Sequence, residues 1–247
     1  MKAIVITGGS RGIGASTARE CARRGYAVIL TYLSNPAAAT DVVARIEREG
    51  GRAAALPLDV GNVATFHAFR QSVEAQLADA WNGSDLAGLV NNAGYGIFKP
   101  IEAVEEAEFD GLFDVHLKGP FFLTQRLLPL MGRGSCIVNV TSATTRAAFA
   151  GVAPYASFKG GLDVLTRYMA KEFGERGIRA NAVSLGAVRT ELGGGITPEF
   201  ESLLAGQTAL GRIGEPDDVA RVIATLLGDD GAWVNAQTID VSGGYII

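Results

Sequence analysis

Tyr155 and Lys159 are four residues apart, so on a helix they would share one face. A phenol has a pKa of about 10, and a neighbouring ammonium group favours the phenolate and lowers that pKa. Thirteen residues before the tyrosine, Ser142 ends an apolar run and can donate a hydrogen bond to a carbonyl oxygen. The three residues together predict acid–base chemistry at a carbonyl or an alcohol. Alone, the Tyr-x-x-x-Lys spacing would more often be an exposed helix pair.

A glycine-rich stretch, "TGGSRGIG" at 7–14, follows a short apolar run and leads into a helical sequence. Gly8, Gly12 and Gly14 have the spacing G-x-x-x-G-x-G. Glycines at such a turn let the main chain approach a pyrophosphate, and the free N–H groups of the following helix face the anion. The alternative is an ordinary glycine-rich turn between a strand and a helix.

Seven short apolar runs alternate with helical stretches along the whole chain. The runs lie at 3–6, 27–32, 53–58, 86–90, 136–141, 178–184 and 237–241, and the clearest helical stretches at 36–51, 65–80 and 218–231. This alternation predicts one α/β domain over residues 1–247, with a doubly wound Rossmann-type fold. We expect a mostly parallel seven-stranded sheet with helices on both faces.

The carboxyl ends of parallel strands meet at one edge of the sheet, and ligands bind there. The glycine turn, "NNAG" at 91–94 and "VTS" at 140–142 all follow or end apolar runs. "YASFK" at 155–159 opens a helix after Pro154. We therefore expect these polar segments to meet at the same edge.

The composition excludes several classes of protein. The chain has 247 residues, 48% of them hydrophobic, a net charge of -4 and scattered basic residues, which argues against a nucleic-acid binder. No apolar segment approaches the roughly 20 residues that a transmembrane helix needs. Two distant cysteines, Cys21 and Cys136, fit buried thiols in a reducing compartment. With only two histidines we expect no metal site, and we expect a cytoplasmic protein.

On these motifs the chain resembles the short-chain dehydrogenase/reductase family, in its single-domain branch. The likeness is greatest to 3-oxoacyl-[acyl-carrier-protein] reductases and related carbonyl reductases, and it runs from "AIVITGG" to "TIDVSGG". Further matching segments are "LDV" (58–60), "FDVHLKGPFFLTQ" (113–125), "RANAV" (179–183), "GAVRTEL" (186–192) and "GRIGEPDDVA" (211–220).

The resemblance implies reduction of a ketone, 3-oxoacyl group or related carbonyl to a secondary alcohol, in a homotetramer or homodimer. Tyr155 would be the general acid, Lys159 would lower its pKa and bind the nicotinamide ribose, and Ser142 would polarise the carbonyl. Asp59 and Val60 would lie near the adenine. The other cofactor contacts implied are Gly8, Ser10, Arg11, Gly12, Ile13, Gly14, Tyr32, Ser34, Asn91, Ala93, Gly94, Val188 and Thr190.

The cofactor we expect is NADP(H) rather than NAD(H). NAD-preferring relatives end the second strand with an acidic residue, whereas "ILTYLSN" at 29–35 contains none. Arg11, with hydroxyl groups from Ser10, Tyr32 and Ser34, suits a 2′-phosphate through charge-assisted hydrogen bonds. The alternative for Arg11 is a solvated loop arginine.

Two residues depart from the family pattern. His116 stands where the family has an asparagine that completes a proton relay, and its main-chain carbonyl could serve in the same way. A packed helical histidine with one hydrogen bond is an equal alternative. Leu185 stands where a proline commonly precedes the glycine, beside the expected nicotinamide site.

The residues expected to face the substrate are mostly small or apolar. They include Tyr95, Phe149 and Val152, with Phe98, the stretch 143–149 and a loop at 191–206. "GGGITPEF" at 193–200 is expected to form part of a lid. Arg146 could bind an anionic group, but a solvated arginine is the favoured interpretation.

Three other classes remain open to different degrees. A dehydrogenase that oxidises a sugar or secondary alcohol would use the same tyrosine. A non-catalytic dinucleotide sensor would more often lack the tyrosine or lysine. A sugar-nucleotide epimerase or dehydratase would need a C-terminal substrate domain, for which 247 residues leave no room.

Overall fold

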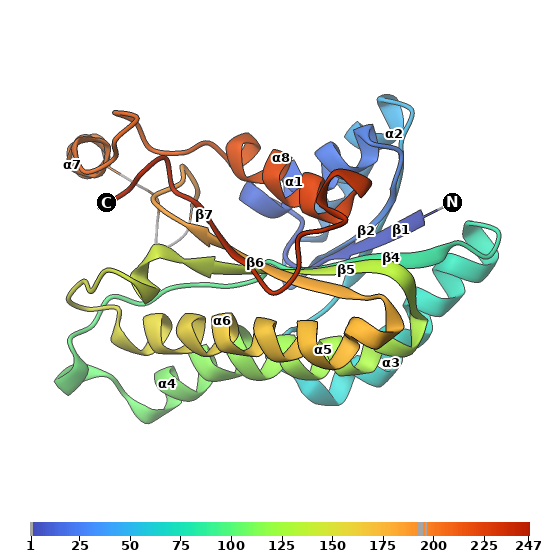
Figure 1. Ribbon diagram of the computed structural model, residues 1–247, viewed down its shortest axis with the longest axis horizontal. Helices are drawn as coiled ribbons and strands as arrows, with labels where there is room; N and C mark the ends of the chain where they lie inside the picture. Colours follow the sequence, from blue (N-terminus) through green and yellow to red (C-terminus); the bar gives the residue numbers. More distant parts are fainter. Residues whose placement is uncertain (1, 192–194, 196) are drawn as a thin grey trace.

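One seven-stranded sheet runs through the computed structural model, which describes residues 2–191, 195 and 197–247 (Figure 1). The strand order is β3-β2-β1-β4-β5-β6-β7, and every neighbouring pair is parallel. The strands are β1 (Lys2–Ile6), β2 (Ala27–Tyr32), β3 (Arg52–Pro57), β4 (Asp85–Asn91), β5 (Met131–Ser142), β6 (Arg179–Leu185) and β7 (Thr238–Val241). The order reverses between β1 and β4, which is the switch point where such sheets bind ligands. The predicted Rossmann-type fold is confirmed.

Helices cover both faces of the sheet (Figure 1). One face carries α1 (Gly12–Arg23), α2 (Pro36–Arg48) and α8 (Pro216–Leu227), and the other carries α3 (Phe66–Ala75), α4 (Glu106–Phe113), α5 (Gly119–Leu127) and α6 (Ala153–Phe173). The helix α7 (Pro198–Gly206) lies at the same end of the molecule as the C-terminus. Short helical segments are η1 (Val63–Thr65), η2 (Gln76–Ala80), η3 (Ile101–Ala103), η4 (Asp114–Lys118), η5 (Leu128–Leu130), η6 (Ala143–Thr145), η7 (Gly174–Arg176) and η9 (Asp229–Gly231).

The central strands are apolar along their whole length because both faces of the sheet are covered. In β1, Ala3 and Val5 belong to the buried cluster on the α3–α6 side, with Phe66. Ile4 and Ile6 belong to the cluster on the opposite side. Alternate side chains of one strand therefore enter two separate cores, which explains why this strand reads as a continuous apolar run.

Helix boundaries differ from the sequence prediction where local hydrogen bonds decide them. The stretch 65–80 is helical, but its last five residues form a π-helical turn, η2. A capping box between Glu215 and Asp218 starts α8 two residues earlier than predicted. The expected loop at 191–206 is partly wrong, because α7 occupies its second half, with the Thr197 side chain capping Phe200 N–H.

Among the residues described, none of the helices is both long and apolar enough to cross a membrane. The same residues contain no group of three or more side chains suited to hold a metal ion.

Candidate active site

The glycine turn joins β1 to α1, and at Gly14 neighbouring atoms leave no room for a side chain. Gly8 and Gly12 have positive φ angles of 66° and 54°, which favour glycine. A Cβ atom at Gly14 would lie 2.2 Å from the Gly8 carbonyl oxygen. The residue before α1, Arg11, makes no side-chain hydrogen bond to the helix end. The first N–H groups of α1 are therefore available to a bound anion.

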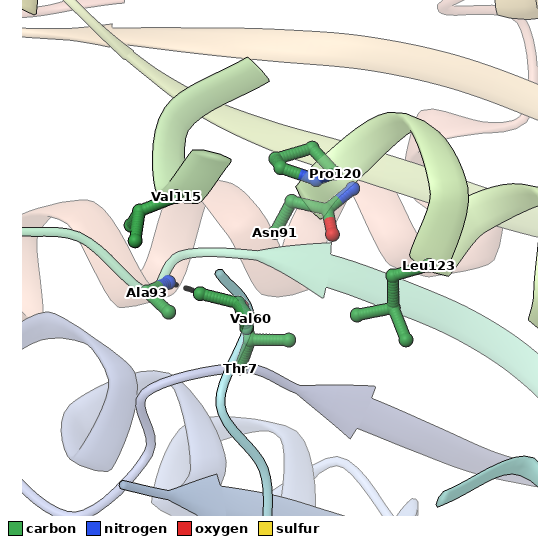
Figure 2. Close-up of a pocket in the computed structure, with 7 residues that line it drawn as sticks. All are labelled: Thr7, Val60, Asn91, Ala93, Val115, Pro120 and Leu123. Carbon is green, nitrogen blue, oxygen red and sulfur yellow. Dashed lines mark hydrogen bonds between the residues drawn. The ribbon is translucent and has the colours of Figure 1, made fainter. Parts of the chain in front are cut away.

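Two residues that were not predicted, Thr7 after β1 and Asn92 after β4, fix this turn. The Asn92 side chain donates to the carbonyl oxygens of Thr7 and Gly8, at 2.9 and 3.1 Å. The Thr7 hydroxyl accepts hydrogen bonds from the main-chain N–H groups of Asn92 and Ala93, both at 3.0 Å. Figure 2 draws the bond from Ala93. The second asparagine of "NNAG" was the available signal, because an amide can pair with two main-chain groups.

Asn91 directs its side chain into the interior. Its amide donates to Asn139 Oδ1 at 2.8 Å, and Asn139 in turn donates to the Thr166 hydroxyl at 2.8 Å. All three side chains are buried. The small cavity beside Asn91 lies between the ends of β1 and β4 and the start of α5 (Figure 2). It is lined by Thr7, Val60, Asn91, Ala93, Val115, Pro120 and Leu123.

Ser142, Tyr155 and Lys159 meet where β5 ends and α6 begins. Pro154 lies in the first turn of α6, where its missing N–H costs no helical hydrogen bond. The Lys159 ammonium group lies 5.6 Å from the centre of the Tyr155 ring and donates to the Val140 carbonyl oxygen at 2.7 Å. The predicted trio is therefore brought together at the carboxyl edge of the sheet.

Burial is the main influence on the pKa of Tyr155 in this structure. Burial raises the pKa of Tyr155 above its ordinary value, and a hydrogen bond with Ser142 lowers it only in part. Burial also lowers the pKa of Lys159 from 10.5 to about 8, although Asp163 favours the charged form. At neutral pH the phenol is protonated and the lysine is charged, which is the state that a proton donor requires.

His116 lies in the π-helical segment η4, between two tyrosines. Its Nε2 atom lies 2.7 Å from the Tyr95 carbonyl oxygen, so this nitrogen carries the proton. The ring meets the Tyr155 ring edge-on at 5.0 Å. Burial and the nearby charge of Lys159 lower the pKa of His116 to about 3, so the ring is neutral. The structure thus shows a packed histidine with one hydrogen bond, and within the described residues Nδ1 has no partner.

Gly94 faces the edge of this imidazole ring. A Cβ atom at Gly94 would lie 2.5 Å from His116 Cε1. A residue with a side chain at this position would displace the ring and, through it, the edge of Tyr155.

Arg11 stands on the exposed side of the glycine turn and pairs with Glu191. The Arg11 Nη1 atom lies 2.5 Å from Glu191 Oε2, and both side chains are exposed. The other predicted cofactor positions on this side are the partly buried Ser10 and Tyr32 and the exposed Ser34. Arg11 is therefore an exposed arginine paired with Glu191, and a bound phosphate could replace this carboxylate as its partner.

Asp59 and Val60 follow β3 at the same edge. Asp59 Oδ1 accepts a hydrogen bond from the Gly61 N–H at 2.9 Å, which orders this turn. A Cβ atom at Gly119 would lie 2.1 Å from the Val60 carbonyl oxygen, so the turn sits directly on the start of α5.

The segment that follows β6 faces the glycine turn. Leu185, which replaces the proline common in the family, ends β6 as a regular strand residue paired with Ser142 and Val241. Val188 forms a parallel bridge with Gly214. Thr190 Cγ2 would lie 3.6 Å from a Cβ atom at Gly12, across the mouth of the cofactor site.

Residues predicted to face the substrate divide into two groups. Tyr95 is 40% exposed beside His116, whereas Val152, the residue before α6, is buried with 8% of its surface exposed. Phe149 stacks on Tyr245 with ring centres 5.9 Å apart. Within the stretch 193–200, predicted to form a lid, residues 193, 194 and 196 lie outside the described residues.

The interpretation of Arg146 as a solvated arginine is wrong. Its Nη1 atom donates to the Ile246 carbonyl oxygen at 2.7 Å, and its Nη2 atom lies 2.8 Å from Asp240 Oδ2. Arg146 therefore ties the C-terminal segment to the loop that follows Ser142. Its partners are about a hundred residues away in the sequence, so no local pattern predicts them.

Comparison with known proteins places this site among oxidoreductases. The family model described as enoyl-(acyl carrier protein) reductase matches residues 8–246. An uncharacterized oxidoreductase of Methylorubrum extorquens is 38% identical over 246 residues, which cover 98% of this chain and 97% of the relative. The 3-oxoacyl-[acyl-carrier-protein] reductase FabG of Staphylococcus aureus is 32% identical over 245 residues, with 98% and 97% covered.

A solved structure of a reductase is also similar to this chain along nearly its whole length. The crystal structure of the angucycline C-6 ketoreductase LanV with bound NADP superposes with a TM-score of 0.95 at 33% identity. It covers 99% of this chain and 95% of the other.

Proposed function

The chain belongs to the short-chain dehydrogenase/reductase family, and from this premise we propose that it is an NADP(H)-dependent reductase that converts a ketone to a secondary alcohol. The observation that carries the proposal is the meeting of Tyr155 with Ser142 and Lys159 at the carboxyl edge of the sheet. We treat residues 1–247 as one dinucleotide-binding oxidoreductase domain.

The glycine turn fits a dinucleotide, because its main chain can approach a pyrophosphate where a Cβ atom would not fit. When bound, the nicotinamide cofactor supplies the hydride. Ser142 donates a hydrogen bond to the substrate oxygen, and Tyr155 transfers its proton to that oxygen as negative charge develops there. Lys159 stays charged at neutral pH and balances the charge left on Tyr155.

His116 has a supporting role in this proposal. Its neutral ring holds the Tyr95 carbonyl and packs edge-on against Tyr155, which restricts the orientation of the phenol. His116 lies in the π-helical turn η4, and such turns inside helices are frequent at functional sites.

The preference for NADP(H) over NAD(H) rests on the residues around the end of β2. This strand ends without an acidic residue that would repel a 2′-phosphate. Arg11 supplies a guanidinium group, and Ser10, Tyr32 and Ser34 supply hydroxyl groups on the same side. The NADP-bound LanV structure supports this assignment.

The substrate in this proposal is a ketone with an apolar, ring-containing body. The residues predicted to face the substrate include the rings of Tyr95 and Phe149 and the methyl-bearing side chain of Val152. LanV is described as an angucycline ketoreductase, and FabG as acting on 3-oxoacyl groups carried by acyl carrier protein. Aromatic side chains favour flat aromatic ketones over thioesters, because stacking adds to the burial of apolar area.

We also expect self-association, as a homotetramer or homodimer. Three helices that cover the same face of the sheet, α4, α5 and α6, carry exposed large apolar side chains: Phe109, Phe113, Phe121, Phe122, Val164 and Tyr168. Exposed apolar patches of this kind mark interaction sites. Light scattering on the purified protein would contradict this expectation if it gave the monomer mass at micromolar concentration.

The test of the proposed function is a set of initial rates of NADPH oxidation with several carbonyl substrates. The set would contain an acetoacetyl thioester, a β-keto ester, a diketone, an aromatic aldehyde, a polycyclic aromatic ketone and a keto sugar. We expect the polycyclic ketone to give the highest kcat/KM. Turnover of the thioester alone would assign the acyl function instead. Tight NADPH binding with no turnover in either direction would support the dinucleotide sensor.

A further inference from the structure

Arg189 lies between Val188 and Thr190 and joins three segments of the chain. Its Nη1 and Nη2 atoms donate to the two carboxylate oxygens of Glu201, both at 2.6 Å. Its Nε atom donates to Glu215 Oε1 at 2.9 Å. One guanidinium group therefore connects the segment proposed to contact the cofactor with α7 and with the start of α8.

The main chain of Arg189 is also held in place, by hydrogen bonds that do not involve its side chain. Its N–H group donates to the Gly214 carbonyl oxygen at 2.8 Å, and the Gly214 N–H group donates to the Ala187 carbonyl oxygen at 2.9 Å. Val188 forms the parallel bridge with Gly214 at the same place. The arginine thus extends from a small ladder of main-chain hydrogen bonds rather than from a free loop.

Glu201, the bidentate partner, belongs to a helix that packs beside the catalytic serine. Leu204, one turn further along α7, lies in a buried cluster with Ala143 and Tyr245. Ala143 directly follows Ser142, and Phe149 packs against the same cluster. A displacement of α7 would therefore reach the wall of the substrate site next to Ser142.

Glu215, the other partner, leads back to the cofactor helix. It is the N-cap residue of α8, and its side chain also accepts the N–H group of Asp218. In the first turn of α8, Asp217 hydrogen-bonds to Ser16 of α1, the helix that begins at the glycine turn. The two carboxylates that Arg189 holds thus belong to the substrate side and to the cofactor side.

An isolated exposed ion pair contributes little to stability, unless its geometry is bidentate or several charges form a network. The ion pairs of Arg189 meet both conditions. The Arg189–Glu201 pair is bidentate, which fits the planar guanidinium group to both carboxylate oxygens. A second carboxylate, from Glu215, accepts from the Nε–H donor, so the group is held from two directions. Glu201 is also less exposed than Arg189, with 31% of its side chain accessible against 51%.

We propose that Arg189 is a positioning residue that fixes α7 against the substrate side of Ser142 from the segment that contacts the cofactor. This inference rests on the proposed reductase function. Arg189 does not touch the reacting atoms; it acts through Glu201 and α7.

The test compares Glu201→Gln and Arg189→Gln with Glu199→Gln in the full-length protein. Glu199 lies on the same helix and makes no ion pair among the described residues, so its variant matches the change in charge. Glu201→Gln is expected to raise the KM for the ketone about fivefold or more, which corresponds to about 1 kcal/mol. Its kcat and its affinity for NADPH should change less than about twofold, and Glu199→Gln should match the wild type.

Because Arg189 and Glu201 act as one unit, the double variant Arg189→Gln/Glu201→Gln should raise KM no further than the more affected single variant. A product of the two single effects would show that they act independently and would overturn the proposal.

Amide hydrogen exchange of residues 198–206 gives a second measurement that needs no substrate. We expect faster exchange in α7 for Arg189→Gln and Glu201→Gln, and unchanged exchange for Glu199→Gln. Unchanged exchange in the first two variants, or faster exchange without a rise in KM, would overturn the proposal. If the wild type reduces no ketone, the proposed function fails, while the exchange measurement still decides whether Arg189 holds α7.

Discussion

The turn after β1 is held by partly buried main-chain and amide hydrogen bonds, whereas the segment from Arg189 to α7 is held by exposed ion pairs. Asn92 fixes the carbonyl groups of Thr7 and Gly8 with one side chain. Arg189 fixes α7 through carboxylates that remain accessible to water. The cofactor side of the site is thus rigid by its packing, and the substrate side depends on contacts that salt, pH and single substitutions can weaken.

This difference fits the two tasks. Every dinucleotide presents the same pyrophosphate, so a turn shaped for it needs no adjustment. A substrate wall built on α7 and the C-terminal segment can be altered without disturbing the sheet, because Tyr245 and Leu204 form their own small buried cluster. The comparison leads to four predictions, from the largest expected effect to the smallest.

The largest effect should come from Gly14→Ala. The new Cβ atom would overlap the Gly8 carbonyl oxygen and the Asn92 amide, at 2.2 and 2.7 Å. We expect a loss of about 3 kcal/mol in the free energy of unfolding, the upper range for overpacking, together with loss of NADPH binding. Chemical denaturation and fluorescence titration measure the two effects. Gly132→Ala, where a Cβ atom would meet nothing within 4 Å, is the control and should resemble the wild type.

Asn92→Leu should have the next largest effect. The substitution keeps the branched shape and the number of side-chain heavy atoms but leaves the carbonyl groups of Thr7 and Gly8 without the amide, at a cost of about 2 kcal/mol in unfolding free energy. We expect weaker binding of NADPH and NADH to the same degree, since the turn serves both. Asn62→Leu, at an exposed position, is the control. An Asn92→Leu protein with wild-type stability would show that the cofactor side is not held in this way.

Arg11→Ala should separate the two cofactors. Losing a charge-assisted contact with the 2′-phosphate is expected to weaken NADPH about tenfold or more and to leave NADH within about twofold. Glu191→Gln removes the present partner of Arg11 and should strengthen NADPH binding modestly. Equal affinities of the wild type for NADPH and NADH would contradict the role assigned to Arg11.

The smallest effects, of a few-fold, should appear in the pH dependence of kcat and KM. We expect kcat to respond to Lys159 and KM to respond to the Arg189–Glu201 pair. Burial lowers the pKa of Lys159 to about 8, so its charge, and with it kcat, should decline as the pH rises through about 8. Since the unfolded lysine keeps its proton up to about 10.5, the free energy of unfolding should rise between those two pH values.

On the substrate side, hydrogen bonds from Arg189 hold the pKa of Glu201 below its ordinary value of 4.5. The ion pair should therefore persist through pH 4.5 and break only as the pH falls further, which raises KM. His116, with a pKa of about 3, should add no inflection between pH 5 and 8. A KM that rises already near pH 6 would contradict this division. Steady-state profiles of kcat and KM measure both arms.

The sequence was sufficient for the parts of the fold that local chemistry decides. Continuous apolar runs predicted all seven strands, because both faces of the sheet are covered. The glycine spacing predicted the turn, since a positive φ at Gly8 and Gly12 restricts the residue type. The edge where these segments meet followed from the parallel topology alone.

Contacts between distant residues could not be predicted in the same way. The direction of the Lys159 ammonium group depends on the Val140 carbonyl, and the pKa of Tyr155 depends on how deeply α6 is packed. The sequence predicted a loop where α7 lies. The helix is buried through Leu204, which clusters with Tyr245, and a contact between residues so far apart leaves no local pattern. Arg146 likewise finds its partners only after the chain has folded.

The central claim is that Tyr155 donates the proton while hydride reaches a ketone carbon at this edge of the sheet. The most direct test follows deuterium from NADPH labelled at the transferable C4 position into the alcohol, by mass spectrometry in a single turnover. The account predicts one deuterium at the carbinol carbon with the wild type, and a rate lower by about a hundredfold or more in Tyr155→Phe, which keeps the ring but not the proton. Transfer at the wild-type rate in Tyr155→Phe, or bound NADPH that passes no deuterium to any ketone tested, would contradict it.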